Sequence, residues 1–182
     1  MARRLSYTGP PVLTAELVAQ WCREHVDDLQ RELVDGVIVP AVTQMCESET
    51  GAAIREAQYQ EDWTAAERAD GVLDVGQVKS ITSVHILRAG AAPEPFTEYE
   101  LGQDQRVAWL EFPGGRPAGA LRVQYLAGVD LEAYPAVKTW LLLQAGTLYQ
   151  QRESLIVGGT VTDLPLKFLG HMLAEIIVPT RF

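Results

Sequence analysis

The 182-residue sequence has few of the residues and motifs that carry chemistry. It contains three histidines, His25, His85 and His171, and none stands in the spacing of a metal-binding motif. It has no Gly-X-Ser-X-Gly nucleophile motif and no glycine loop followed by Lys and Ser or Thr. We therefore predict no catalytic, cofactor-binding or metal-binding residue, and a protein that is not an enzyme.

Positive charge is also scarce. Against 24 Asp and Glu the chain has 15 Lys and Arg, for a net charge of -9 at pH 7. Proteins that bind nucleic acid by neutralising phosphates need clustered Lys and Arg, and the one basic pair is Arg3-Arg4. This composition argues against DNA recognition.

Long apolar runs are missing as well. No stretch approaches the roughly 20 residues that span a bilayer, and no apolar region of a signal peptide follows the arginine pair. Cys22 and Cys46 are the only cysteines, and we expect both to pack as small hydrophobic residues in a reduced compartment. The sequence predicts a soluble protein with no membrane contact.

Two helical patterns open the chain. Thr14 is placed to cap a helix that continues to about Glu24. A second pattern begins after Asp27 or Asp28 and ends at Gly51, with apolar residues at steps of three and four that predict one wide buried stripe: Leu29, Leu33, Val34, Val37, Ile38, Ala41, Val42 and Met45. Pro40 lies inside this run and predicts a kink or break, because proline removes a backbone donor.

The middle of the chain has the composition of strands. Residues 53–128 contain short runs rich in Val, Ile, Tyr and Thr, separated by breaks rich in Gly, Pro and Asp. Leu121, Val123 and Tyr125 alternate with polar residues, as in a sheet with one buried face. We predict an antiparallel sheet with strands at residues 54–63, 78–87, 99–101, 107–112 and 120–126.

Helical patterns return near the C-terminus. Pro135 is suited to a first turn and opens a helix to Arg152, and Asp163 with Pro165 opens a last helix to Ile177. Helices, sheet and helices in this order predict the α+β class. We expect a single domain over residues 1–182. In it a small bundle of about four helices, from residues 14–51 and 135–177, carries an antiparallel β-sheet insertion at 53–128 between the second and third helices, with a tail at 178–182.

Several landmarks follow one another in a characteristic order. They are a helix start at Thr14, an acidic break at Asp27-Asp28, a helix end at Thr50-Gly51, residues 78–84, residues 123–128, Tyr134-Pro135, Arg152-Glu153, Val157-Gly158 and Asp163-Leu164-Pro165. In this order and over nearly the whole chain they resemble the head-to-tail connector (adaptor) family of tailed bacteriophages. Pro40 within the second helix departs from the family pattern.

This resemblance implies a structural virion protein of the neck, assembled in the host cytoplasm. It implies a ring of about twelve copies beneath the portal protein, which joins the capsid to the next neck or tail protein. DNA would pass through its channel without sequence-specific binding. We expect acidic or neutral side chains in the channel, with the sheet insertion or the loop at residues 94–100 as a candidate lining.

The resemblance also implies that the C-terminal helix and tail dock onto the portal. This segment is apolar over more than one face, and it ends in residue types that are favoured at interface hot spots. The predicted docking residues are Leu166, Phe168, Leu169, Met172, Leu173, Ile176, Arg181 and Phe182.

Two other readings stay open. Another neck component, such as a stopper or tail-completion protein, would share the task of joining rings. A wall-degrading hydrolase would use a glutamate such as Glu61 or Glu111, and it would need a second carboxylate about 5 to 10 Å away in a cleft.

Overall fold

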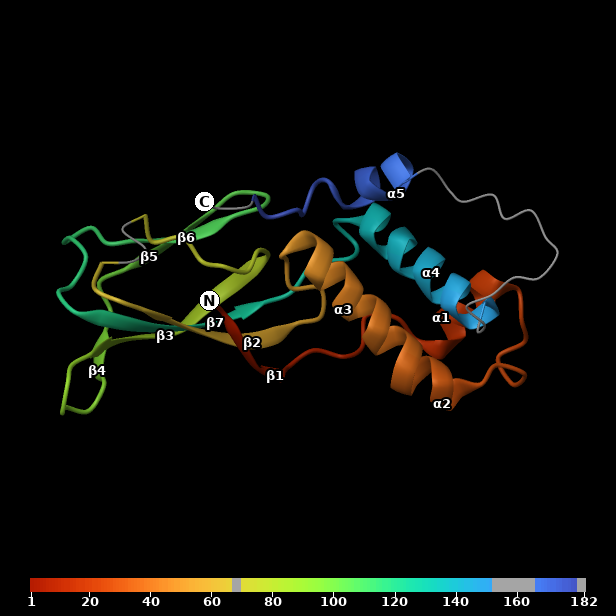
Figure 1. Cartoon of the computed structure of the whole chain (residues 1–182), viewed down its shortest axis with the longest axis horizontal. Helices are drawn as coiled ribbons and strands as arrows, with labels where there is room; N and C mark the ends of the chain where they lie inside the picture. Colours follow the sequence, from red (N-terminus) through yellow and green to blue (C-terminus); the bar gives the residue numbers. More distant parts are fainter. Residues whose placement is uncertain (67–69, 152–165, 180–182) are drawn as a thin grey trace. The chain divides into compact units, whose positions relative to one another are not determined.

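The structure is a computed structural model that describes residues 1–66, 70–151 and 166–179, without the side chains of residues 166–168. Figure 1 shows the course of the chain. The described strands are β1 (Arg3–Tyr7), β2 (Ala57–Trp63), β3 (Val78–Leu87), β4 (Glu94–Phe96), β5 (Glu100–Gln103), β6 (Ala108–Glu111) and β7 (Ala120–Ala127). The described helices are α1 (Ala15–Cys22), α2 (Arg31–Leu33), the π-helix η1 (Val34–Ile38), α3 (Val39–Thr50), α4 (Pro135–Gln150) and α5 (Leu166–Leu173).

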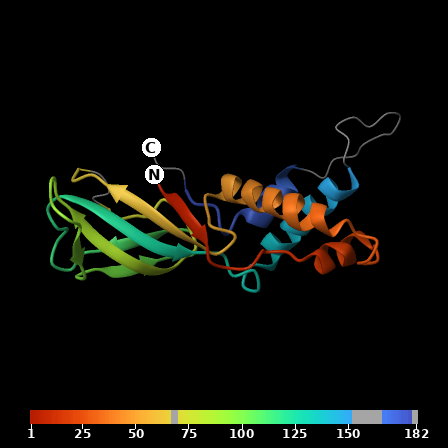
Figure 2. The ribbon, with the colours of Figure 1, turned by 90° about the horizontal axis from the view of Figure 1, so that it is seen from below.

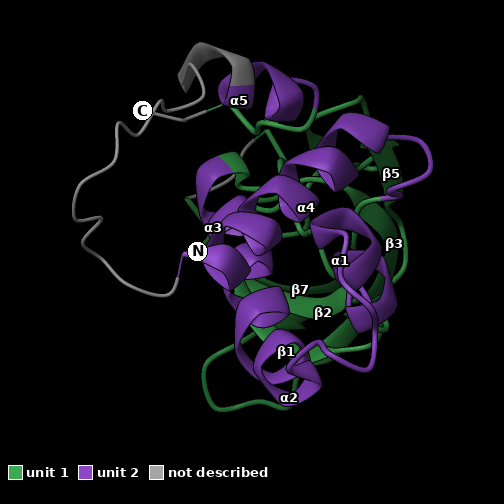
Figure 3. Ribbon diagram, turned by 90° about the vertical axis from the view of Figure 1, so that its right-hand side faces the viewer, with its two compact units in different colours: residues 1–10, 50–129, 176–182 green, residues 11–49, 130–175 purple. Residues whose placement is uncertain are grey.

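By its internal contacts the chain divides into two compact units, which Figure 3 shows in different colours. The β unit comprises residues 1–10, 50–129 and 176–182, and the helical unit comprises residues 11–49 and 130–175. Helices and antiparallel strands are both present, so the predicted α+β class is confirmed. The arrangement as one domain, with a bundle that carries the sheet as an insertion, stays a prediction.

The β unit contains a five-stranded antiparallel sheet in the order β1-β2-β7-β3-β4 and a separate hairpin of β5 and β6. Figure 2 shows β1 at one edge of the larger sheet. Leu121, Val123 and Tyr125 of β7 are fully buried, as their alternation predicts. The Tyr125 ring stacks on Tyr59 at a centroid distance of 5.7 Å. The central strand β7 therefore carries much of the core.

The predicted strands agree closely with the structure, and residues 78–87 form β3 without any change of bounds. Two strands were not predicted, β1 and β4. β1 is exposed along its whole length and so lacks an apolar alternation, and β4 has only three residues. Both lie at sheet edges, where the strands are largely exposed and no alternation of apolar and polar residues marks them in the sequence.

The helical unit is built around α4, which contacts α1, η1 and α5. Pro135 occupies the first turn of α4, and the buried residues of this helix include Trp140 and Leu141. Thr14 caps α1 by accepting a hydrogen bond from the Leu17 N–H at 3.3 Å. These three features confirm the predicted helices at Thr14 and Pro135.

The second predicted helix is interrupted close to Pro40. The chain is a π-helix over η1 and becomes an α-helix at Val39, whose N–H donates to the Val34 carbonyl, five residues back. A π turn changes the hydrogen-bond register just before the proline, which has no N–H to donate. The predicted irregularity is confirmed, but Asp27 and Asp28 do not cap this helix, which begins at Arg31 after Gln30.

Candidate interaction surfaces

The C-terminal segment, predicted to dock onto a partner, is partly occupied by contacts within the protein. Leu173 and Ile176 are fully buried, whereas Leu169 and Met172 are half-buried. The side chains of Leu166 and Phe168, and Arg181 and Phe182 altogether, lie outside the described residues. The structure therefore brings together only part of the predicted docking set on one helix.

The chain after α5 is fastened to the β unit. The Val178 N–H donates to the Thr50 carbonyl at 2.7 Å, and the Val178 side chain packs on Gly51 and Gly76. A Cβ added at Gly76 would lie 2.6 Å from Val178 Cγ2, so the close approach requires glycine there. Ile176 and Val178 thus hold the start of the tail in place.

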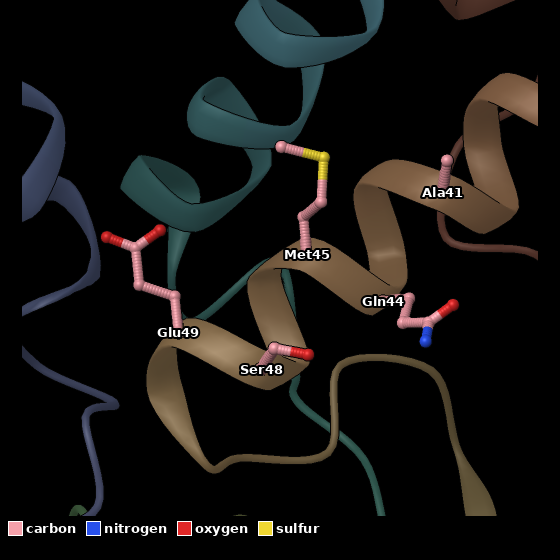
Figure 4. A pocket seen from close by; sticks show the side chains of 5 residues that line it. All are labelled: Ala41, Gln44, Met45, Ser48 and Glu49. Atoms are coloured by element: carbon pink, nitrogen blue, oxygen red, sulfur yellow. The ribbon is translucent and has the colours of Figure 1, made fainter.

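An exposed face of η1 and α3 forms the second surface. Val37 is 57 % exposed and Met45 is 45 % exposed, although both belong to the stripe that was predicted to be buried. The prediction was wrong for these two residues, since the buried side of η1 and α3 consists of Val34, Ile38, Val39, Val42, Thr43, Cys46 and Thr50. An open hollow of about 610 Å³ lies over the exposed face, and its described lining residues are Ala41, Gln44, Met45, Ser48 and Glu49 (Figure 4).

The four tryptophans have different surroundings. Trp63 and Trp140 are buried core residues, whereas Trp21 at the end of α1 is 42 % exposed. Trp21 packs beside Gly146 of α4, where an added Cβ would lie 3.0 Å from Trp21 Cδ1. The exposed part of the indole is a candidate contact, because tryptophan is enriched among interface hot spots.

A third surface lies on β1 of the β unit. The guanidinium carbons of Arg4 and Arg55 lie 4.2 and 4.3 Å from the centre of the exposed Tyr7 ring. Arg55 also donates from Nε to the Gly9 carbonyl at 2.9 Å. This arrangement gathers positive charge on an exposed edge strand of the chain.

The predicted channel-lining segment is exposed and acidic. Glu94, Glu98 and Glu100 are all exposed, and Glu94 pairs with Arg88 at 2.9 Å. Glu100 lies opposite Glu111 in the β5–β6 hairpin, a pairing of like charges that is unfavourable in isolation. The segment is acidic, as was expected of a channel lining, and its position in a channel stays a prediction.

The glutamates that a hydrolase would use are held by tryptophans. Glu61 is fully buried and accepts hydrogen bonds from Trp63 Nε1 at 2.8 Å, Tyr125 Oη at 2.6 Å and the Asp74 N–H at 2.8 Å. Burial and the adjacent Glu61 raise the pKa of Tyr125. Because Glu61 is enclosed on all sides, it cannot contact a polysaccharide.

Glu111 is exposed on β6 and accepts from Trp109 Nε1 at 2.7 Å. Among the described residues no group of three or more His, Cys, Asp or Glu is placed to hold a metal ion. Burial, with Glu49 and Glu47 nearby, raises the pKa of the Cys46 thiol to about 12, so this thiol is unreactive at neutral pH. None of these groups forms a catalytic arrangement.

Two surfaces were missed by sequence reasoning, the α3 face and the Arg4–Tyr7–Arg55 cluster. The first had a signal, since an apolar stripe wider than one helix face leaves some members exposed. The second joins residues about 50 positions apart through the pairing of β1 with β2, and the sequence of an exposed strand gives no indication of that pairing. In the described residues, no helix has the length and apolar content needed to cross a bilayer.

Comparison with known proteins gives a likeness of fold over the whole chain. No protein-family model matches the sequence, and no curated protein matches it. Among solved structures, a chain in the virion of a native gene transfer agent (GTA) particle is 18 % identical, with a TM-score of 0.77. A chain in the neck of an empty GTA particle, computed with C6 symmetry, is 16 % identical with a TM-score of 0.76. A chain in the neck of a native GTA particle, computed with C12 symmetry, is 18 % identical with a TM-score of 0.69. Each match covers 100 % of this chain and 97 % of the other.

Proposed function

We propose that the protein is a structural subunit of a phage-like neck, and specifically a head-to-tail adaptor. In this role about twelve copies form a ring beneath the portal, join the capsid to the next neck or tail protein and continue the DNA channel. The observation that carries the proposal is the fold likeness to neck chains of GTA particles over the full length of both chains. In this role the protein is located in the virion neck, after assembly in the host cytoplasm.

The side chains support a role in assembly, with no catalytic function. Glu61 is enclosed, Glu111 is exposed on the β5–β6 hairpin, where it accepts a hydrogen bond from Trp109, and exposed apolar residues occur on helices. Exposed residues such as Trp21 and Met45 are of the types that interfaces use. DNA passes such a ring without specific contacts, which suits a chain of net charge -9.

The C-terminal helix and tail are proposed to dock onto the portal. In this proposal the buried Leu173 and Ile176 anchor the segment to the rest of the chain. The half-buried Leu169 and Met172, together with Leu166, Phe168, Arg181 and Phe182, then provide the contact with the portal. The hydrogen bond from Val178 to Thr50 fixes where the tail begins.

The test is co-sedimentation of the purified protein with portal particles. A truncation that removes residues 180–182 keeps the Val178 hydrogen bond, so its circular dichroism should match that of the wild type while co-sedimentation is lost. A Met172→Asp variant should act in the same direction. Leu148→Asp is the matched control, because Leu148 is also a partly exposed apolar residue on a helix.

The outcomes separate the alternatives. A truncated protein that is folded and still binds the portal would remove the tail from the docking element. A wild-type protein that does not bind the portal but occurs in the neck of assembled particles would identify a stopper or tail-completion protein. Lysine replacements of Glu94, Glu98 and Glu100 should slow DNA ejection if this segment lines the channel.

A further inference from the structure

The helical unit is strongly acidic, and one of its exposed faces is an exception. Its residues include five Lys and Arg and thirteen Asp and Glu, a net charge of -8. The exposed face of η1 and α3 carries no charge over Val37, Pro40, Ala41, Gln44, Met45 and Ser48, and the first charged residue along it is Glu49. Two like-charged units repel each other, so a charge-free face is where another copy can approach most closely.

The same unit carries a projection that suits this face. Trp21 is 42 % exposed at the end of α1, and Arg23 follows it in a left-handed conformation with φ of 58°. Arg23 is exposed and is one of the unit's few basic residues. An aromatic residue beside an arginine is the pair of residue types most enriched at interface hot spots.

We propose that Trp21 and Arg23 of one copy dock into the α3 hollow of the next copy. The indole fills the hollow between Ala41, Gln44, Met45 and Ser48, and the Arg23 guanidinium faces the Glu49 carboxylate at its rim. The hollow of about 610 Å³ is larger than one indole ring. This inference rests on the proposed function, because it assigns the contact between neighbours in the ring.

The two surfaces are separate, as a ring requires. In Figure 3, α3 lies on one side of α4 and α1 lies on the other. A contact between two different surfaces of identical copies is head-to-tail, and such contacts close into rings when the rotation between copies allows it. A contact of one surface with itself would stop at a dimer.

The test is a charge-reversal cycle, measured by sedimentation velocity of the full chain at about 0.15 M salt and up to about 1 mM protein. Arg23→Glu and Glu49→Lys should each weaken self-association at least fivefold, because each places like charges across the contact. The double variant restores the opposite charges and should return to within about twofold of the wild type. Both residues that change, Arg23 and Glu49, are exposed in the free chain, so the fold is retained.

Glu132→Lys is the matched control for Glu49→Lys. It makes the same charge change on an exposed residue of the helical unit, and the ion pair that Glu132 forms with Lys138 is exposed to solvent. Since it lowers the net repulsion, it should leave self-association equal or slightly stronger. Met45→Glu, which puts a charge into the hollow, should weaken self-association at least tenfold, and Thr82→Glu on β3 should not.

Any other occupant of the α3 hollow would give a different result. If α3 faces meet each other, Arg23→Glu has no effect and the double variant is not restored, which overturns the proposal. If a foreign protein covers the hollow, no variant changes self-association while Met45→Glu abolishes co-sedimentation with the portal, which also overturns it. A further outcome is that the charge-reversal cycle gives the expected result while the wild-type protein never binds the portal. That outcome would support the contact between copies and contradict the adaptor function.

Discussion

The two units of the chain handle charge in different ways. The β unit contains ten Lys and Arg and eleven Asp and Glu, a net charge of -1, whereas the helical unit has a net charge of -8. In the β unit, several acidic groups are paired with cations, as in the pairs of Asp62 with Arg122 and Glu56 with Lys79, and Glu61 is enclosed. In the described part of the helical unit, most acidic residues are exposed to solvent.

The two units should therefore respond to different changes. Polar contacts inside the β unit contribute to its own stability, so their removal lowers the free energy of unfolding. Surplus charge on the helical unit acts over the distance between copies, so it responds to salt. Changes in the β unit should therefore alter folding, and changes in solution conditions should alter how helical units associate.

The largest expected effect is at Glu61. Glu61→Ala leaves the Trp63 Nε1–H, the Tyr125 hydroxyl and the Asp74 N–H without the acceptor that they share in the core. We expect a loss of about 3 to 5 kcal/mol in the free energy of unfolding, because buried donors lose their partner and a cavity is added. Urea denaturation followed by tryptophan fluorescence measures this loss.

Glu111 provides a matched control for Glu61. Each glutamate accepts from the indole of a tryptophan two residues away on its own strand, but Glu111 is exposed. Glu111→Ala should change the free energy of unfolding by no more than about 0.5 kcal/mol. Equal losses for the two variants would contradict the view that burial decides the contribution of the carboxylate.

The next effect concerns salt and the helical unit. Raising the salt from about 0.02 M to about 0.5 M shortens the Debye length well below the separation of most charges on neighbouring copies. We expect the free protein to be mostly monomeric at low salt, with self-association at least tenfold stronger at high salt. Light scattering at both salt concentrations measures it, and a stable ring at low salt without portal would contradict the prediction.

Much of the fold follows from local patterns. The bounds of β3 and the alternation in β7 were predicted because one face of each strand is buried and the other is not. Thr14 and Pro135 marked helix starts through their own backbone chemistry. β1 and the exposure of Met45 were not predictable in this way, because they depend on which distant segment covers a face.

The candidate surfaces also divide into features that the local sequence predicts and features that depend on tertiary packing. The apolar C-terminal segment was visible in the sequence, but only the structure shows that Leu173 and Ile176 already have internal contacts. The hollow on α3 and the exposure of Trp21 depend on tertiary packing around α4. A sequence pattern reports that a residue is apolar, and packing decides whether it remains available to a partner.

A smaller effect is expected when the pH is lowered. Hydrogen bonds from Arg122 hold the pKa of Asp62 below its usual range, through a bidentate contact at 2.8 Å for each oxygen. A depressed pKa means that this contact stabilises the fold fully above the ordinary aspartate value of about 3.9, and that the stabilisation is lost as the pH falls below it. Both side chains are partly exposed, so we expect no more than about 1 kcal/mol.

The measurement compares wild type with Asp62→Asn by urea denaturation between about pH 6 and pH 3. The difference in the free energy of unfolding should shrink as the pH falls, since the wild type loses the contact that the variant never has. Asp70→Asn is a control, because Asp70 is an exposed acidic residue of the same unit. A difference between wild type and Asp62→Asn that stays constant across this range would contradict the assignment.

The smallest effect is expected at Tyr7, where the β unit accommodates positive charge beside an aromatic ring. Arg4 and Arg55 lie over the ring within 4.3 Å, and a cation beside the face of an exposed ring contributes about 0.5 to 1 kcal/mol. Tyr7→Phe keeps the ring and should leave the free energy of unfolding unchanged, whereas Tyr7→Leu should lower it by about that amount. Leu5→Ala is the control, since Leu5 is a similarly exposed apolar residue at the bulge of the same strand, and we expect a smaller loss there. If Tyr7→Phe and Tyr7→Leu have the same free energy of unfolding, the ring does not contribute a favourable interaction with the two arginines. The positive charge of Arg4 and Arg55 would then be accommodated in the β unit without the aromatic ring.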